Sequence, residues 1–137
     1  MSNWTHVVGT IRIDCLRGLY EYEDKPNFDE IFGKECRWID DNSIWNDAEE
    51  NPQNFLPMGS EGSLHKIVWE NPDKSHISSY MVTVFGDLRD HDEPDDIIKW
   101  FKEICSKLWV RNAVIEVTNE WYGTKVYSYN SEEAKGE

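Results

Sequence analysis

The densest group of potentially reactive side chains is "GDLRDHDEPDD", residues 86–96, where six carboxylates accompany one arginine and one histidine. Asp87, Asp90, Asp92 and Glu93 offer the hard oxygen ligands that Ca²⁺ and Mg²⁺ prefer. A calcium-binding loop follows the pattern D-x-[DN]-x-[DN]-G, however, and this run has no glycine at the turn position. We therefore expect neither a resident metal nor a cofactor, and a Mg²⁺ or Mn²⁺ site completed by other loops stays open as an alternative.

Part of this run is explained by a helix that begins within it. Pro94 suits the first helical position, which makes Asp92 or Glu93 the expected cap. Asp95 and Asp96 then lie in the first turn, where the helix dipole stabilises an anion by about 0.3–1 kcal/mol. The residues left over are expected to form an exposed loop after a strand, and they are Asp87, Arg89, Asp90 and His91.

Signatures of catalysis are weak elsewhere in the chain. The four histidines form no H-x-x-x-H or H-E-x-x-H pair, and His6 is the one expected on a strand face beside other polar groups. "GSEGS", residues 59–63, has neither G-x-S-x-G nor G-K-[ST], so its glycines indicate a tight loop before a strand. If this loop bound an anion, it would use backbone N–H groups, and its ligand-binding candidates are Gly59, Ser60, Gly62 and Ser63.

The charge balance excludes some classes of partner. The 137 residues hold 27 acids and 14 bases, a formal net charge of −13, whereas nucleic-acid binding depends on clustered Lys and Arg. The same charge disfavours an anionic membrane surface, and no segment has the length and apolarity of a membrane span or the pattern of a signal peptide. We expect a cytoplasmic protein. Cys15 and Cys105 fall in apolar patterns and are expected in the core, whereas Cys36 has polar neighbours.

Periodicity predicts an α+β domain. Alternation of apolar and polar residues indicates a strand over 6–16, and an amphipathic spacing indicates the main helix over 94–108. A helical turn capped by Asn27 should end at Gly33. Two further antiparallel hairpins are expected, from 64–70 with 76–86 and from 111–121 with 125–129.

This order of elements favours a ferredoxin-like sandwich, in which an antiparallel-dominated sheet carries its helices on one face and a right-handed crossover leads through the main helix. Residues 1–130 should form the single domain, and 131–137 a flexible acidic tail.

An acidic, partly irregular excursion interrupts this pattern between the first two strands. From residue 19 to residue 51, eleven acids accompany three bases, together with aromatic anchors. Such a surface suits a nucleic-acid mimic that competes for a basic channel, and it equally suits a solvated flap. With the run at 86–96 it supplies the predicted partner-binding residues, which are Tyr22, Trp38, Asp40, Asp41, Trp45, Asp87, Asp90 and Asp92.

Three stretches, "NWTHVVGTIRID", "FLPMGSEGSLHKIVWENP" and "VTVFGDLRD", together resemble a family of small uncharacterised proteins of tailed phages and prophages. The resemblance covers about half of the chain, omits the acidic excursion and lends no active-site residue. It implies a phage setting, in which accessory proteins commonly bind and block host machinery, including restriction and CRISPR nucleases.

The leading hypothesis is therefore a non-enzymatic phage or mobile-element protein that binds and inhibits a host protein through an acidic, aromatic-studded surface. One alternative is an immunity protein that neutralises a basic nuclease toxin. Another is a small-ligand or divalent-metal-dependent enzyme that uses His6, residues 59–63 and the acids near Asp87. Seven tryptophans also leave a homodimer open, because large aromatic side chains serve an interface as well as a core.

Overall fold

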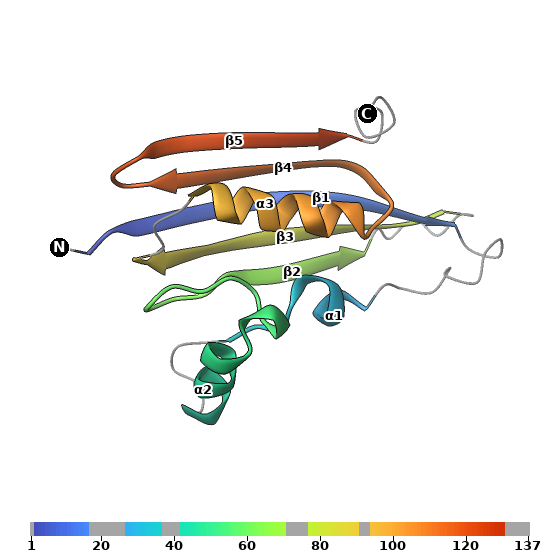
Figure 1. Cartoon of the computed structure of the whole chain (residues 1–137). Helices are drawn as coiled ribbons and strands as arrows, with labels where there is room; N and C mark the ends of the chain where they lie inside the picture. Colours follow the sequence, from blue (N-terminus) through green and yellow to red (C-terminus); the bar gives the residue numbers. More distant parts are fainter. Residues whose placement is uncertain (1, 17–26, 37–41, 71–76, 91–93, 131–137) are drawn as a thin grey trace.

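The computed structural model describes residues 2–16, 27–36, 42–70, 77–90 and 94–130, which form an α+β fold around one antiparallel sheet (Figure 1). The strands are β1 (Trp4–Leu16), β2 (His65–Glu70), β3 (Ile77–Arg89), β4 (Val110–Asn119) and β5 (Gly123–Asn130). The helices are α1 (Phe28–Phe32), α2 (Asn42–Glu50), the single 3₁₀ turn η1 (Pro52–Asn54) and α3 (Pro94–Ser106).

The first strand lies at the centre of the sheet. The strand order is β2-β3-β1-β4-β5, and every neighbouring pair is antiparallel. Since β3 and β4 both run opposite to β1, they are parallel to each other, and α3 crosses from one to the other over the strand between them (Figure 1). The expected antiparallel hairpins β2–β3 and β4–β5 are confirmed.

The core lies between the sheet and α3. Alternate residues of the three central strands point to this side, and Ile11, Val82 and Ile115 are fully buried there. From α3, Ile97 and Phe101 complete the layer, as the amphipathic spacing predicted. Each such side chain contributes about 1.5–3 kcal/mol through its burial. This layer fixes the register of the sheet, because a one-residue slip would expose all of it.

Helix α1 has the predicted cap and the predicted end. The Asn27 side chain accepts a hydrogen bond from the Glu30 backbone N–H, and Gly33 has φ 102°. A Cβ at Gly33 would collide with the backbone of Phe55, so only glycine fits. Phe28 and Phe32 are buried, and the ring of Phe32 lies edge-on to that of Trp100 in α3. The first described part of the excursion is therefore a helical turn that belongs to the main core.

Two features differ from the sequence-based expectation. β3 continues to Arg89, so Asp87 and Arg89 are strand residues, and the exposed loop expected there is wrong. Helix α2 was not predicted within the excursion. At the end of β3 the local sequence is polar, and pairing with β1 determines the structure.

Both described cysteines are buried, whatever the polarity of their neighbours in the sequence. Cys105 is buried as expected, and its burial raises the pKa of the thiol to about 12, which keeps it protonated at neutral pH. Cys36 is fully buried in spite of its polar neighbours in the sequence. The Cys15 side chain lies outside the described residues.

Candidate functional site

His6 lies between two carboxylates at the end of the sheet where β1 begins. Its Nδ1 is 2.6 Å from Oδ1 of Asp87, its cross-strand neighbour, and its Nε2 is 3.7 Å from Oε1 of Glu120. All three side chains are about half exposed. Both ion-pair partners of His6 are carboxylates, and Thr118 is its cross-strand neighbour on β4. This group is an exposed, acidic surface feature.

The end of β3 is paired on both sides. Its register with β1 runs to Trp4 opposite Arg89, and the loop at 59–63 lies along its other edge. There Ser60 N–H donates to the Arg89 carbonyl at 2.8 Å, and Arg89 N–H donates to the Glu61 carbonyl at 3.0 Å. Nη1 of Arg89 also lies 2.7 Å from Oε1 of Glu61. Arg89 therefore connects the loop to the strand.

At the end of β3, Asp90 is hydrogen-bonded to Asn3 near the start of the chain. Its Oδ1 accepts a hydrogen bond from the Asn3 backbone N–H at 3.0 Å, and its own N–H donates to the Asn3 carbonyl at 2.6 Å. Its φ of 56° lies in the left-handed region, which aspartate tolerates better than most residues. The second carboxylate oxygen accepts from the Ser60 hydroxyl at 3.4 Å. Asp90 has a structural role here, which is compatible with the predicted partner contact and does not test it.

The loop Gly59–Ser63 is shaped by its approach to β3. A Cβ at Gly59 would collide with the backbone of Arg89, and one at Gly62, whose φ is 78°, with the carbonyl of Asp87. The amide of Gly59 donates to the Gly62 carbonyl. Together with the amide of Ser60, it is therefore already used within the protein. The Ser63 hydroxyl donates to the Leu64 carbonyl at 3.1 Å. Ligand binding at Gly59, Ser60, Gly62 and Ser63 stays a prediction. The amides of Gly59 and Ser60 are not available to an anion, because they already donate within the protein.

Helix α2 projects beyond the β2 edge of the sheet, away from α3 (Figure 1). Its buried Ala48 packs in a small second cluster with Cys36 and Phe55. Its C-terminal half is acidic, with exposed Asp47, Glu49 and Glu50, and the sequence of the helix contains no basic residue. The described part of the acidic excursion is thus anchored at both ends, by α1 in the main core and by α2 in its own cluster.

The predicted partner-binding residues are only partly described. Asp87 and Asp90 lie at the end of β3, as above. Trp45 belongs to α2, but its side chain lies outside the described residues. The others fall outside the described ranges altogether, and they are Tyr22, Trp38, Asp40, Asp41 and Asp92.

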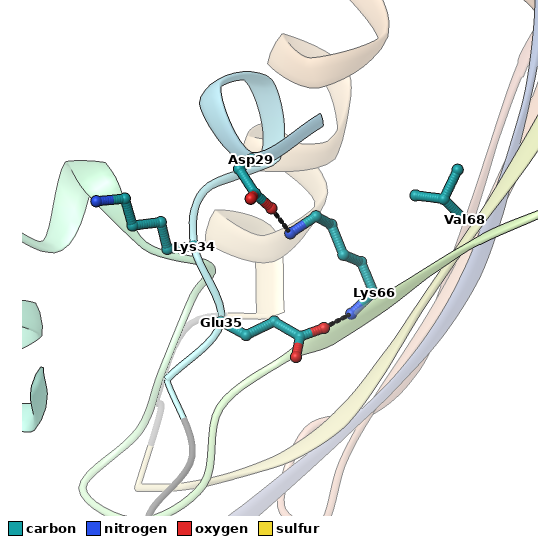
Figure 2. Close-up of a pocket in the computed structure, with 5 residues that line it drawn as sticks. All are labelled: Asp29, Lys34, Glu35, Lys66 and Val68. Carbon is teal, nitrogen blue, oxygen red and sulfur yellow. Dashed lines mark hydrogen bonds and ion pairs between the residues drawn. The ribbon is translucent and has the colours of Figure 1, made fainter. Parts of the chain in front are cut away.

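An open hollow of about 490 Å³ separates α1 from β2 (Figure 2). Nζ of Lys66 lies 2.7 Å from Oδ1 of Asp29 and donates to the Gly33 carbonyl at 3.1 Å. The Lys66 backbone N–H donates to Oε1 of Glu35 at 3.0 Å. These contacts tie the excursion to an edge strand and give one of its outward N–H groups a partner. Both carboxylates of the hollow already bind Lys66, so we interpret it as a structural contact.

The face of the sheet opposite α3 carries a band of exposed apolar side chains, and sequence reasoning missed it as a site. Cross-strand pairs place seven large apolar side chains on this face, each 37–62% exposed. They are Val8, Ile67, Trp69, Met81, Phe85, Val114 and Val126. The signal was visible in β3, whose two alternating sets are both partly apolar. That pattern fits the interior position of the strand, and it also marks an apolar surface.

The described residues contain no group of three or more His, Cys, Asp or Glu side chains arranged to hold a metal ion. None of the described helices has both the length and the apolar character needed to cross a membrane. Comparison of the chain with protein-family models, curated proteins and solved structures found no match.

Proposed function

We propose that this protein is a non-enzymatic binding protein that inhibits a host protein through an acidic surface centred on α2 and on the residues leading into it. The observation that supports the proposal is the projection of α2 beyond the sheet, with three exposed acids and no base along its sequence. Carboxylates arrayed in this way attract a basic partner and speed its association, whereas buried aromatic side chains supply most of the binding energy. Trp45 of α2 is the proposed anchor.

The setting belongs to the same proposal. The three resembling stretches suggest a phage or mobile-element protein in the cytoplasm of its host, and the net charge of −13 suits a partner that handles nucleic acid, such as a CRISPR nuclease. Such a partner carries a basic channel that is shaped for phosphates. The acidic surface would compete with nucleic acid for that channel.

Neutralising the acids of α2 tests this. We expect the triple variant Asp47→Asn, Glu49→Gln, Glu50→Gln to lose host proteins that the wild-type chain captures from lysate at about 0.1 M salt, because their attraction depends on unscreened charge. The matched control neutralises three exposed acids of α3, at Asp95, Asp96 and Glu103, which changes the net charge equally. The control should keep the same partners.

The same partners recovered with both variants would contradict the proposal, and so would binding that does not change with salt. The captured protein should also lose nucleic-acid binding when the wild-type chain is added. If nucleic acid and this chain bind the captured protein together, the mimicry part of the proposal is wrong.

We also propose that the fold is ferredoxin-like, extended by one strand. The order β1-α1-β2-β3-α3-β4 follows the split β-α-β arrangement, and β5 adds to the β4 edge. An experimental structure with α1 and α3 on opposite faces of the sheet would contradict this.

A further inference from the structure

On the open face of the sheet, residues that are neighbours across the strands form rows, and the character of these rows changes regularly along the strands. At the end where β1 begins, the row of His6 and Asp87 is polar and acidic, with Glu120 beside it. Three rows follow that contain the seven exposed apolar side chains. At the far end Arg111 pairs with Asp14, with 2.6 Å between Nε and Oδ2. The apolar band is therefore bounded by acids at one end and by the Arg111–Asp14 ion pair at the other.

The middle row of the band lies on Thr10 and Thr83, which are neighbours on β1 and β3. The rows on either side are its apolar flanks, one with Val8 and Phe85 and the other with Met81. Glu116 lies in the first flank and Arg12 in the second, two rows apart on adjacent strands. A two-fold axis that runs across the strands through the middle row would exchange the two flanks.

We propose that this face binds a second copy of the same chain, sheet against sheet, around that two-fold axis. The rotation lays Phe85 of one copy over Met81 of the other, and Ile67 and Val114 of the middle row over their own counterparts. In the same arrangement Val8 meets Arg12, and Trp69 meets His65. It also brings Arg12 of each copy beside Glu116 of the other, and each acidic end faces the end that carries the Arg111–Asp14 ion pair. A two-fold interface must be self-complementary, and the pairing of Arg12 with Glu116 meets that condition.

The size of the face lies at the lower end of the range for stable interfaces. Five strands spaced by about 4.8 Å and nine residues of β1 at about 3.3 Å each give a flat projection of roughly 600 Å². Side-chain relief adds to this, and a stable interface buries about 800 Å² of accessible surface on each partner. Sheets packed face to face in this way keep their strands within about 30° of each other and leave about 10 Å for the interleaved side chains.

Sedimentation equilibrium of the full chain tests the proposal. We expect a mass of twice 16.2 kDa for the wild type and a mass of one chain for Trp69→Glu, because the new carboxylate would be buried in the interface. The matched control is Trp121→Glu. Trp121 is similarly exposed, at 60% against 55% for Trp69, but it lies in the β4–β5 turn beyond the face. This control should remain dimeric.

A charge exchange tests the orientation. Arg12→Glu should raise the dissociation constant of the dimer at least tenfold, since it places like charges together, and Glu116→Arg in the same chain should restore it. Both side chains are exposed, so neither change threatens the fold. A monomeric wild-type chain at all concentrations overturns the proposal. Equal dissociation of the dimer in the two tryptophan variants also overturns it. So does a double variant whose dimer dissociation constant is no lower than that of Arg12→Glu.

This dimer does not depend on the acidic-surface proposal. The α2 variant with three neutralised acids should still dimerise, and monomeric Trp69→Glu should still capture host proteins. Failure of one proposal therefore leaves the other unaffected.

Discussion

Two aspartates of one short segment have different roles, although sequence reasoning grouped them. The Asp87 carboxylate is 64% exposed and contacts the exposed ring of His6, whereas Asp90 holds the Asn3 backbone with two hydrogen bonds. The sequence predicted both as free surface acids. It could not separate them, because the difference depends on a contact between residues 87 positions apart. Of the two, Asp87 has the more exposed side chain, at 64% against 46% for Asp90.

We predict that Asp90→Ala lowers the free energy of unfolding by about 1–2 kcal/mol, because alanine loses the bond to Asn3 and is disfavoured at a φ of 56°. Asp87→Ala removes an exposed pair and should cost less than about 1 kcal/mol. Urea unfolding of both variants measures this. Asp90→Asn is the control, since asparagine keeps an acceptor and tolerates the left-handed region. Its free energy of unfolding should lie between those of the two alanine variants. Equal losses for the two alanine variants would contradict this assignment.

At the scale of elements, what could be predicted from the sequence depended on how local the signal was. The alternation in β1, the apolar stripe of α3 and the Asn27–Gly33 caps of α1 are local patterns, and all three were predicted correctly. Helix α2 packs Ala48 against Cys36 and Phe55, and the mostly polar sequence of the helix did not indicate this contact.

The open apolar face could not be identified from the sequence for a related reason. Alternation shows that both sides of β3 are partly apolar, but it does not show which side a helix covers. The crossover of α3 over β1 decides that, and it is a property of the whole topology.

Attachment of the excursion to β2 gives the prediction at this scale. Lys66→Met should lower the stability of the protein by about 1 kcal/mol, because the side chain is only 7% exposed and its two bonds hold α1 to the edge strand. Lys34→Met is the matched control, since Lys34 lines the same hollow but is exposed, and its effect should stay within about 0.5 kcal/mol. Hydrogen exchange in α1 should accelerate in Lys66→Met alone. Equal exchange rates in both variants would show that Lys66 does not hold the helix.

For the whole molecule, the net charge of −13 predicts opposite salt responses for its two proposed associations. A basic partner is attracted by that charge, so raising the salt from about 0.05 M to about 0.5 M should weaken its binding at least tenfold as the screening length shortens. Two copies of this chain repel each other at long range, and the apolar band between them is not weakened by salt. The dissociation constant of the dimer should therefore stay constant or fall over the same range. Sedimentation equilibrium and partner titration in matched buffers measure the two responses. A dimer that dissociates at high salt would mean that the charged ends, rather than the apolar rows around Thr10, hold the two sheets together.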